Sequence, residues 1–256
     1  MSDAFWSPPP VAGVAPVHPA NLGRPALVLL AGMLGDPSLW DGIAGRLNDL
    51  ARPWPVRIDL DDSIAELAAS VLAAAPEQFV LAGHSLGGIV ALEVQRRAPS
   101  RVRGLVLVNT SPLGPSPAQH QSWSELARRV EAGQFAAVAD ELARATLPPA
   151  SDPGLLAASR AMAESVGPAG LVCQLSAQQS RSDYRAGLTE IGVPVLVLGG
   201  AEDTICPLDR QRELAAGCDR ATLVELPGAG HMLPLERPEA VAGAIRDWWP
   251  RLHPAQ

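Results

Sequence analysis

The sequence predicts an α/β fold, in which a mostly parallel sheet of about six strands is covered by helices on both faces. The first observation is that short, uninterrupted runs of Val, Leu and Ile alternate with segments of helical periodicity. Such runs are typical of strands that are buried on both faces of a parallel sheet. The second observation is one long interval, 110–193, in which only helical spacing recurs. We expect it to form a helical cap, inserted before the next-to-last strand and lying over the strand ends where open α/β sheets bind ligands.

Composition and charge narrow the class of protein. The chain has 256 residues, of which 47% are hydrophobic and 18% charged, and this composition is typical of a globular protein rather than a disordered one. Its net charge is -7 and its basic residues do not cluster, which argues against nucleic acid or an anionic membrane as the main partner. The longest apolar runs, 26–30 and 193–198, are much shorter than the ~18 residues that cross a bilayer, so we expect no membrane insertion.

The cysteines and the N-terminal segment bear on location and domain organisation. Cys173, Cys206 and Cys218 show no C-x-x-C spacing, so they predict neither a disulfide scaffold nor a zinc site and favour a cytoplasmic location. The N-terminal segment lacks the basic and apolar regions of a secretory signal. Because 1–24 is rich in Pro and Gly, we expect an extended arm there with at most a weak edge strand. The core then comprises 25–111 and 190–256, and the helical cap comprises 112–189.

The elements of the first half follow from apolar runs and from the residues that end them. Residues 62–75 are expected to form a helix because Ser63 and Glu66 have the spacing of a capping box and Pro76 stops the helix. The other elements follow from periodicity. We expect strands at 26–31, 56–60, 78–82 and 102–108 and further helices at 39–50 and 86–98.

The second half contains the cap and the last two strands. Apolar residues at helical spacing predict three helical segments, which either cover the site or merely pack on the core; we favour the cap. These residues are Trp123, Leu126, Ala127 and Val130, then Phe135, Val138 and Leu142, then Leu155, Met162 and Val166. Strands are expected at 194–198 and 222–226, and a final helix, with Pro238 in its first turn, at 238–249.

The strongest functional signal is the segment 83–87, GHSLG, which lies between a predicted strand and a predicted helix. In this context G-x-S-x-G is typical of a nucleophile elbow. A serine at such a sharp turn is held in a strained backbone conformation, and the flanking glycines remove Cβ atoms that would clash. The N-terminus of the following helix would stabilise a developing oxyanion. We therefore expect Ser85 to be a nucleophile rather than part of an ordinary turn.

From about Pro25 to Trp249 the chain resembles the α/β-hydrolase family, in which a serine, an acid and a histidine follow in this order along the chain. The segment 200–207, GAEDTICP, matches the family's G-x-x-D-x-x-x-P loop after the next-to-last strand. The segment 228–232, GAGHM, follows the last strand, and PLERP at 234–238 is also similar to the family's ending. The resemblance implies a catalytic triad of Ser85, Asp203 and His231.

Each triad residue has a competitor. Glu202 adjoins Asp203, but the spacing of the loop favours Asp203. Asn109 stands where some relatives carry the acid, and an amide cannot do that work. His84 belongs to the elbow and is expected to point away from the site and support the turn. The remaining histidines are expected to be ordinary surface residues: His18, His120 and His253.

The same resemblance implies an oxyanion hole and a pocket. Its two backbone N–H groups would be those of Leu86, which follows the nucleophile, and of Met33, in the loop after the first strand. Relatives usually begin this loop with His-Gly, whereas this chain has Ala31 before its glycine, a departure that bears on the rigidity of the loop. The residues expected to bind substrate are Leu34, Trp123, Met162 and Met232.

These roles predict a serine hydrolase that cleaves small to medium carboxylic esters, with lactones or thioesters also possible substrates, through an acyl-enzyme intermediate. No metal ion or cofactor is required, and the expected partner is a small-molecule ester. Ser85 argues against haloalkane dehalogenases and epoxide hydrolases, which use an aspartate nucleophile. The absence of a glycine-rich phosphate motif argues against a dinucleotide-binding oxidoreductase. Because fold does not settle the reaction, a C–C bond hydrolase, a lyase similar to that of the menaquinone pathway and a non-enzymatic ligand sensor stay open.

Overall fold

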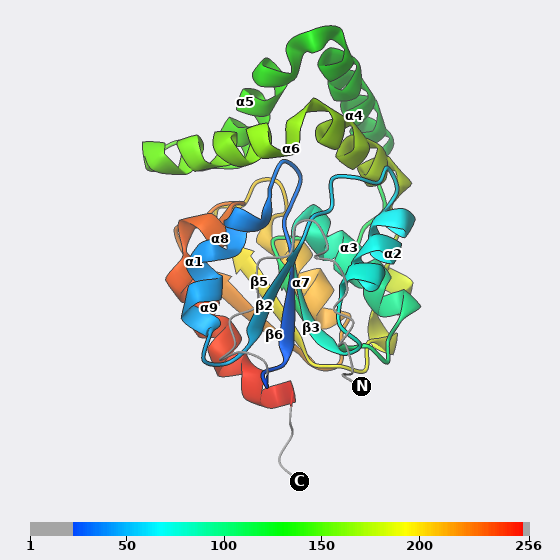
Figure 1. Ribbon diagram of the computed structural model, residues 1–256, viewed down its shortest axis with the longest axis vertical. Helices are drawn as coiled ribbons and strands as arrows, with labels where there is room; N and C mark the ends of the chain where they lie inside the picture. The colour runs from blue at the N-terminus through cyan, green and yellow to red at the C-terminus, as the bar shows by residue number, and fades with distance from the viewer. Residues whose placement is uncertain (1–22, 253–256) are drawn as a thin grey trace, which may run out of the picture.

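The computed structural model describes residues 23–252, so the arm predicted for 1–24 lies outside the described residues except for its last two. Six strands form one sheet in the order β2-β1-β3-β4-β5-β6, and every neighbouring pair is parallel (Figure 1). The predicted fold class is confirmed, and the sheet is wholly parallel in the described part of the chain. The strands are β1 (Ala26–Leu30), β2 (Arg52–Val56), β3 (Phe79–His84), β4 (Val102–Val108), β5 (Val195–Gly200) and β6 (Ala221–Leu226).

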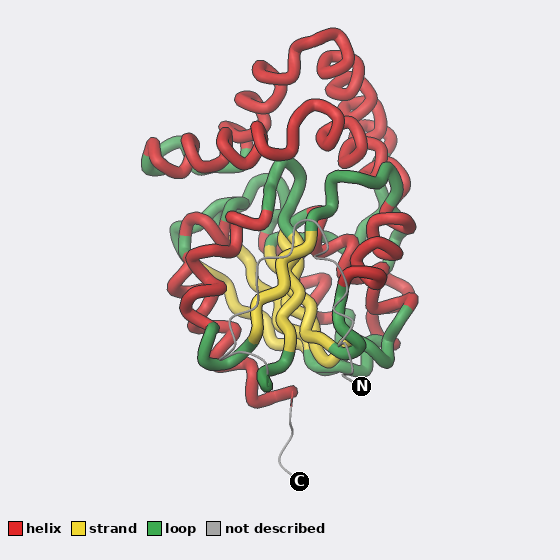
Figure 2. Tube along the Cα trace, viewed as in Figure 1, coloured by secondary structure: helices red, strands yellow, loops and turns green. Residues whose placement is uncertain are grey.

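Helices cover both faces of the sheet because successive side chains of each strand point to opposite faces (Figure 2). Val28 and Leu81 pack on one face with α2, α3 and α7, and Leu27 and Val80 pack on the other with α1, α8 and α9. The bounds of these helices are α1 (Asp41–Ala44), α2 (Ile64–Ala74), α3 (Leu86–Arg97), α7 (Leu208–Ala216), α8 (Leu233–Glu236) and α9 (Pro238–Trp248).

Two predictions for the first crossover are wrong. The second strand is Arg52–Val56 and not 56–60. It contains Pro53 and Pro55, which an edge strand tolerates, and β2 pairs only with β1 at the sheet edge. The helix expected at 39–50 is instead a chain of short helical turns, namely η2 (Pro37–Trp40), α1 and η3 (Gly45–Leu47). Gly42 and Gly45 explain the interruption, since glycine weakens a helix interior.

The other predicted core elements lie within two residues of their expected bounds, whereas no expected element corresponds to α7 or α8. In α2 the predicted cap is present, since the Ser63 hydroxyl accepts a hydrogen bond from the Glu66 N–H at 3.2 Å. The Glu66 carboxylate accepts the Ser63 hydroxyl proton at 2.9 Å rather than bonding the backbone. Local sequence signals therefore place the core elements well wherever no proline or glycine intervenes.

Between β4 and β5 the chain leaves the sheet and forms a helical layer beyond the carboxyl ends of the strands (Figure 1). We call Pro117–Ser180 the upper helices: α4 (Pro117–Arg129), η4 (Val130–Gln134), α5 (Phe135–Ala145) and α6 (Pro153–Ser180). They share a buried cluster that contains Trp123, Val138, Val166 and Leu171. In the described part of the chain, no helix has both the length and the apolar character that a membrane span requires.

The order of the strands positions the functional site. After β1 the chain moves outward to β2 and then returns to β3 on the other side of β1. The connections that leave the carboxyl ends of β1 and β3 therefore run in opposite directions along the sheet. Open parallel sheets bind their ligands at the carboxyl edge between two such strands. The segments after Leu30 and after Gly83, which are paired neighbours in the sheet, meet at this point.

Candidate active site

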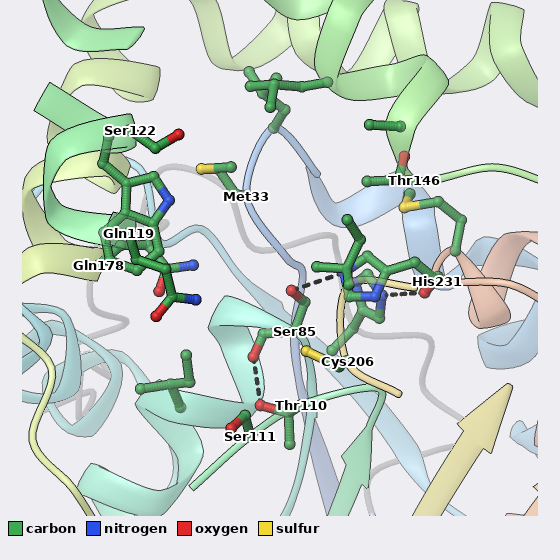
Figure 3. Close-up of a pocket in the computed structure, with 18 of the residues that line it drawn as sticks. Met33, Ser85, Thr110, Ser111, Gln119, Ser122, Thr146, Gln178, Cys206 and His231 are labelled. Carbon is green, nitrogen blue, oxygen red and sulfur yellow. Dashed lines mark hydrogen bonds between the residues drawn. The ribbon is translucent and has the colours of Figure 1, made fainter. Parts of the chain in front are cut away.

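Ser85 stands at the turn between β3 and α3 in a strained conformation, with φ 51° and ψ -114°. The neighbouring glycines are required by close packing. A Cβ atom at Gly83 would lie 2.3 Å from the carbonyl oxygen of Gly87, and one at Gly87 would lie 2.5 Å from that of Ala31. The hydroxyl of Thr110, two residues after the end of β4, donates to the Ser85 carbonyl oxygen at 2.7 Å and holds the turn (Figure 3). Ser85 is thereby fixed at the edge of a cavity.

The structure brings the three predicted triad residues together. The His231 Nε2 atom lies 3.0 Å from the Ser85 Oγ atom, and the His231 Nδ1 atom lies 2.8 Å from the Asp203 Oδ2 atom. Since an ionised carboxylate can only accept, Nδ1 carries the proton and Nε2 is left to accept the serine proton. Glu202, the competitor, is exposed to solvent, whereas Asp203 is buried.

Asp203 is kept ionised by its surroundings. Burial by itself would raise the pKa of its carboxyl group. The hydrogen bond from His231, the electrostatic attraction of that ring and two backbone N–H groups outweigh burial and lower the pKa below its ordinary value. These N–H groups belong to Ile205 and Cys206 and donate to the Asp203 Oδ1 atom at 2.8 and 2.9 Å. The carboxylate is therefore oriented by its own loop and directed at His231.

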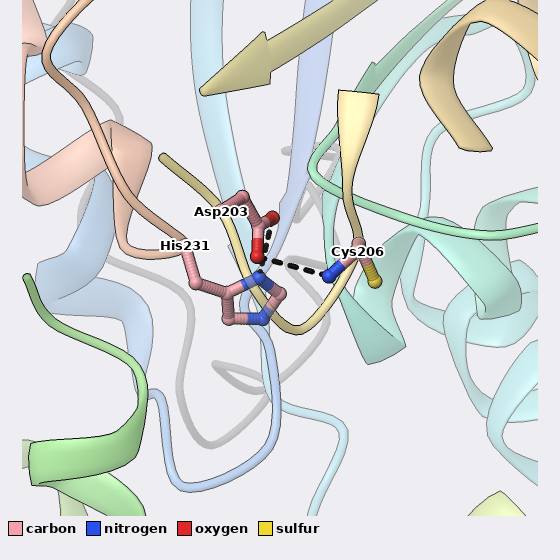
Figure 4. Close-up of side chains that lie close together, drawn as sticks. All are labelled: Asp203, Cys206 and His231. Carbon is pink, nitrogen blue, oxygen red and sulfur yellow. Dashed lines mark hydrogen bonds and ion pairs between the residues drawn. The ribbon is translucent and has the colours of Figure 1, made fainter. Parts of the chain in front are cut away.

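Figure 4 shows that Cys206 lies beside this pair, and the donor atoms of Asp203, Cys206 and His231 are within 4.8 Å of one another. The three groups fit a hydrogen-bond network better than a metal site. Both Asp203 oxygens are already hydrogen-bonded. Burial and the nearby Asp203 charge raise the pKa of the Cys206 thiol to about 12, so it stays protonated at neutral pH. A neutral thiol is not the ligand form of cysteine.

The prediction that His84 points away from the site is wrong. Its Nε2 atom lies 2.8 Å from the His231 carbonyl oxygen, and the two imidazole rings are 5.0 Å apart. Burial, followed by the proximity of His231, lowers the pKa of His84 to about 3, so the ring is neutral at physiological pH. A neutral ring that donates from Nε2 can hold the His231 loop without adding a charge to the site.

Asn109 ties the loop after β5 to the loop after β6. Its side-chain amide donates to the carbonyl oxygens of Gly230 and His231, both at 2.8 Å, and its oxygen accepts from the Gly200 N–H at 2.8 Å. The residue is fully buried. The expectation that it does not serve as the acid agrees with this role, because the amide uses both donors and acceptor to position the loops that carry Asp203 and His231.

The two predicted oxyanion donors lie on the segments that meet at the strand-order reversal. Neither the Met33 N–H nor the Leu86 N–H donates a hydrogen bond to another described residue. The Met33 loop is held from above by a residue that sequence reasoning missed: the Gln174 side-chain oxygen in α6 accepts from the Leu34 N–H at 2.8 Å. Gln174 is fully buried and also reaches the Ile58 carbonyl oxygen at 3.3 Å. Its only sequence signal is a polar residue within an apolar helical stretch.

A cavity of about 650 Å³ lies between the core and the upper helices and contains the Ser85 and His231 side chains. All four predicted substrate-binding residues line it: Leu34, Trp123, Met162 and Met232. Met33 also lines it, and Figure 3 shows Met33 and Ser85 among the lining side chains. Arg181 lines this cavity too, although no pattern in the sequence singled it out.

Comparison with known proteins supports the same assignment of fold. Residues 2–244 match the model of the alpha/beta hydrolase family. A pimeloyl-[acyl-carrier protein] methyl ester esterase from Aromatoleum aromaticum is 30% identical over 250 residues, which cover 88% of this chain and 98% of that protein. A protein from Klebsiella pneumoniae that carries the name of a carbamate hydrolase is 26% identical over 248 residues, which cover 88% of this chain and 91% of its own length.

Among solved structures, a thermophilic esterase from Thermogutta terrifontis is similar with a TM-score of 0.83 and 27% identity, over 90% of this chain and 91% of that chain. With a family match over most of its length and relatives of the same size, the chain belongs to the alpha/beta hydrolase family of enzymes.

Proposed function

We propose that this chain is a serine esterase that hydrolyses small to medium carboxylic esters, with Ser85 as nucleophile, His231 as general base and Asp203 as its orienting acid. The observation that carries the proposal is the continuous hydrogen-bond path from Ser85 through His231 to Asp203. Ser85, at one end of this path, lines the cavity. Two relatives named as esterases support the ester as the substrate. Three free cysteines support a reducing, cytoplasmic location.

In the acylation step the Ser85 Oγ atom attacks the acyl carbon while its proton moves to the His231 Nε2 atom. The negative charge that develops on the carbonyl oxygen would be bound by the N–H groups of Met33 and Leu86, and the α3 helix dipole adds to this stabilisation. Asp203 stabilises the imidazolium without taking its proton. The imidazolium then protonates the leaving alkoxide, and the alcohol departs.

In the deacylation step a water molecule attacks the acyl-enzyme. The His231 ring accepts one proton of the water, the second tetrahedral intermediate forms at the same oxyanion donors, and its collapse releases the acid. The proton returns from His231 to the Ser85 oxygen. The serine, the histidine and the carboxylate are then in their starting states, and no further reactant is needed.

The test is hydrolysis of a p-nitrophenyl ester series from acetate to decanoate by the wild-type protein, Ser85→Ala and Ser100→Ala. Ser100 is exposed and lies near the opposite ends of the strands, so it controls for the loss of a serine hydroxyl. We expect Ser85→Ala to lower kcat by at least about 1,000-fold with an unchanged circular dichroism spectrum, and Ser100→Ala to match the wild type.

Labelling with a fluorophosphonate separates the remaining outcomes. Stoichiometric labelling of Ser85 together with ester turnover supports the proposal. Ester hydrolysis that persists in Ser85→Ala contradicts the assigned nucleophile. A labelled protein that turns over no ester in the series contradicts the esterase function and favours the C–C hydrolase, lyase or sensor alternatives.

A further inference from the structure

Arg181, the residue directly after α6, is a buried cation whose hydrogen-bond partners are all neutral. Only 9% of the residue is exposed, and its guanidinium lies 5.1 Å from the centre of the Trp123 ring system. It donates to the side-chain oxygens of Gln178 at 3.0 Å and Gln119 at 3.1 Å and to the Gly114 carbonyl oxygen at 3.5 Å. Among the described residues, no carboxylate is paired with it.

An unpaired buried cation is unfavourable, because a charge that leaves water needs an opposite charge or a full set of hydrogen bonds. Burial lowers the pKa of Arg181 from its ordinary value, yet arginine stays protonated in proteins. Its Nε atom is buried and has no hydrogen-bond partner in the part of the chain that the structure describes. The C-terminus of α6 offers about half a negative charge, which does not neutralise a full positive one.

The charged side chains that line the cavity are all positive. Two arginines, Arg181 and Arg210, line it, and none of its described lining residues is an aspartate or a glutamate. This stands out because the chain as a whole has 27 acidic and 20 basic residues. Arg210 is exposed and already paired with Glu213 at 3.0 Å. Arg181 is therefore the buried positive charge of the cavity that has no carboxylate partner among the described residues.

The position of Arg181 relative to the reacting group follows from its partners. Figure 3 shows Gln119 and Gln178 on one side of Ser85 and His231 on the other. Arg181 is hydrogen-bonded to both glutamines, and these residues and Ser85 line one cavity. A substrate held at Ser85 could therefore extend one of its ends toward the guanidinium.

We propose that Arg181 binds a free carboxylate of the substrate, so that the preferred substrate is an ester that also carries a carboxylate group. This inference rests on the proposed esterase function, since it names the substrate class of the same site. The guanidinium would form charge-assisted hydrogen bonds with the carboxylate, and these are strong where water is excluded. The chain between the carboxylate and the ester then sets whether the acyl carbon reaches Ser85.

The first experiment compares kcat/KM, measured by proton release, for charged esters and for methyl-ended esters of the same length. One arm uses monoethyl esters of dicarboxylic acids, with the charge on the acyl side. The other uses butyrate esters of hydroxy acids, with the charge on the alcohol side. We expect the wild type to prefer the charged ester by about 10- to 100-fold at an optimal length in one arm. Equal kcat/KM for charged and neutral esters at every length would overturn the inference, and this result needs no variant.

The variants assign the preference to a residue. Arg181→Gln is expected to lower kcat/KM of the charged ester by about 10- to 100-fold, mainly through KM, and that of the neutral ester by less than about threefold. Arg181→Lys should keep part of the preference because it keeps the charge. Arg185→Gln is the matched control, and we expect it to change the preference by less than about threefold because Arg185 is exposed, is paired with Asp183 at 2.6 Å and does not line the cavity. Equal losses on both esters in Arg181→Gln would contradict the assigned residue.

A binding measurement separates this inference from the esterase proposal. Free dicarboxylates are titrated into Ser85→Ala by calorimetry, with and without Arg181→Gln. Binding that requires Arg181 supports the carboxylate site even if no ester is hydrolysed, and in that case only the esterase proposal fails. Ester turnover without charge preference or dicarboxylate binding leaves the esterase proposal intact and overturns the inference.

Discussion

At the scale of single residues, the candidate site depends on three side chains that take no part in the proposed chemistry. His84 and Asn109 both bond the His231 carbonyl oxygen, at 2.8 Å each, and Thr110 holds the Ser85 carbonyl oxygen. They fix the backbone of the proposed nucleophile and of the proposed base rather than their side chains. Because small displacements of reacting groups lower rates strongly, such positioning matters as much as the identity of the triad.

His84 links the stability of the fold to pH. Burial lowers its native pKa to about 3, whereas an unfolded histidine titrates near pH 6.5. Above pH ~6.5 the His84 ring is neutral in both the folded and the unfolded chain, so its titration costs no stability. As the pH falls from there toward about 3, the unfolded chain binds a proton on His84 and the folded chain does not, which favours the unfolded chain. His84 should therefore lower the free energy of unfolding by about 1.4 kcal/mol per pH unit between roughly pH 6 and pH 4.

We expect His84→Gln to reduce the slope of the unfolding free energy against pH by about 1.4 kcal/mol per pH unit, the value for one proton. An amide does not titrate but can still donate to the His231 carbonyl oxygen. Urea denaturation of the wild type and the variant at several values in this pH range measures the slope. Equal slopes would mean that His84 is not held neutral in the folded state.

At the scale of elements, α6 connects the upper helices to the Met33 loop of the candidate site. It breaks at Gly167, where φ is +71°, followed by Pro168, and this break divides the long helix into two arms. The second arm carries Gln174, which holds the Met33 loop, and ends just before Arg181. In this chain, where the usual loop histidine is replaced by Ala31, a side chain from α6 supplies the support for the loop.

Gln174→Leu tests this support. It would leave the buried Leu34 N–H and Ile58 carbonyl oxygen without their partner, which should destabilise the fold by about 1–3 kcal/mol. We expect kcat to fall by about tenfold with a smaller change in KM, since the neighbouring Met33 N–H would lose its position relative to the oxyanion. Steady-state kinetics and urea denaturation provide both values.

Gln179→Leu is the matched control, because Gln179 lies on the same helix and, among the described residues, is hydrogen-bonded only to the Leu175 carbonyl oxygen and to Ser124. It should keep kcat within about twofold of the wild type, because surface contacts of this kind contribute little. A Gln174→Leu protein that loses stability but keeps kcat would show that the residue supports the fold and not the oxyanion loop.

At the scale of the whole molecule, the cavity is formed by the core from below and by the upper helices from above. Ser85 and His231 come from the core, while Trp123, Met162 and Arg181 come from the segment 112–189. We therefore propose that this segment acts as a cap whose side chains select the substrate. Changes in the cap that face the cavity should alter selectivity, and changes that face the cap interior should alter stability.

Met162→Phe and Val138→Ala form the test pair. Met162 lines the cavity, so a larger side chain should lower kcat/KM for the longest acyl chains by about tenfold with a small change in Tm. Val138 is fully buried among the upper helices and does not line the cavity, so its truncation should cost about 1–3 kcal/mol of stability and leave the chain-length optimum unchanged. If Met162→Phe changed only Tm, the result would mean that the segment 112–189 packs on the core without selecting the substrate.

The sequence by itself determined the features that depend on neighbouring residues. Apolar periodicity marked most strands and helices, and the spacing of the segments around Ser85, Asp203 and His231 marked the three residues that the structure brings within hydrogen-bonding distance. This is possible because strand and helix periods, turn glycines and helix caps are properties of short segments. The two exceptions lie in the first crossover. The prolines of the second strand are acceptable only at an edge that pairing in the sheet defines, and glycines interrupt the helix expected at 39–50.

Only the tertiary structure decided which polar groups meet. The Gln174 contact with Leu34 joins residues 140 positions apart, the His84 contact with His231 joins residues 147 apart, and Arg181 has no motif at all. A buried polar side chain needs a partner, but the identity of that partner depends on which segments the fold brings together and not on local spacing. Local sequence thus marks the strained turn of Ser85, whereas the support of the candidate site and the charge of its cavity arise from long-range packing.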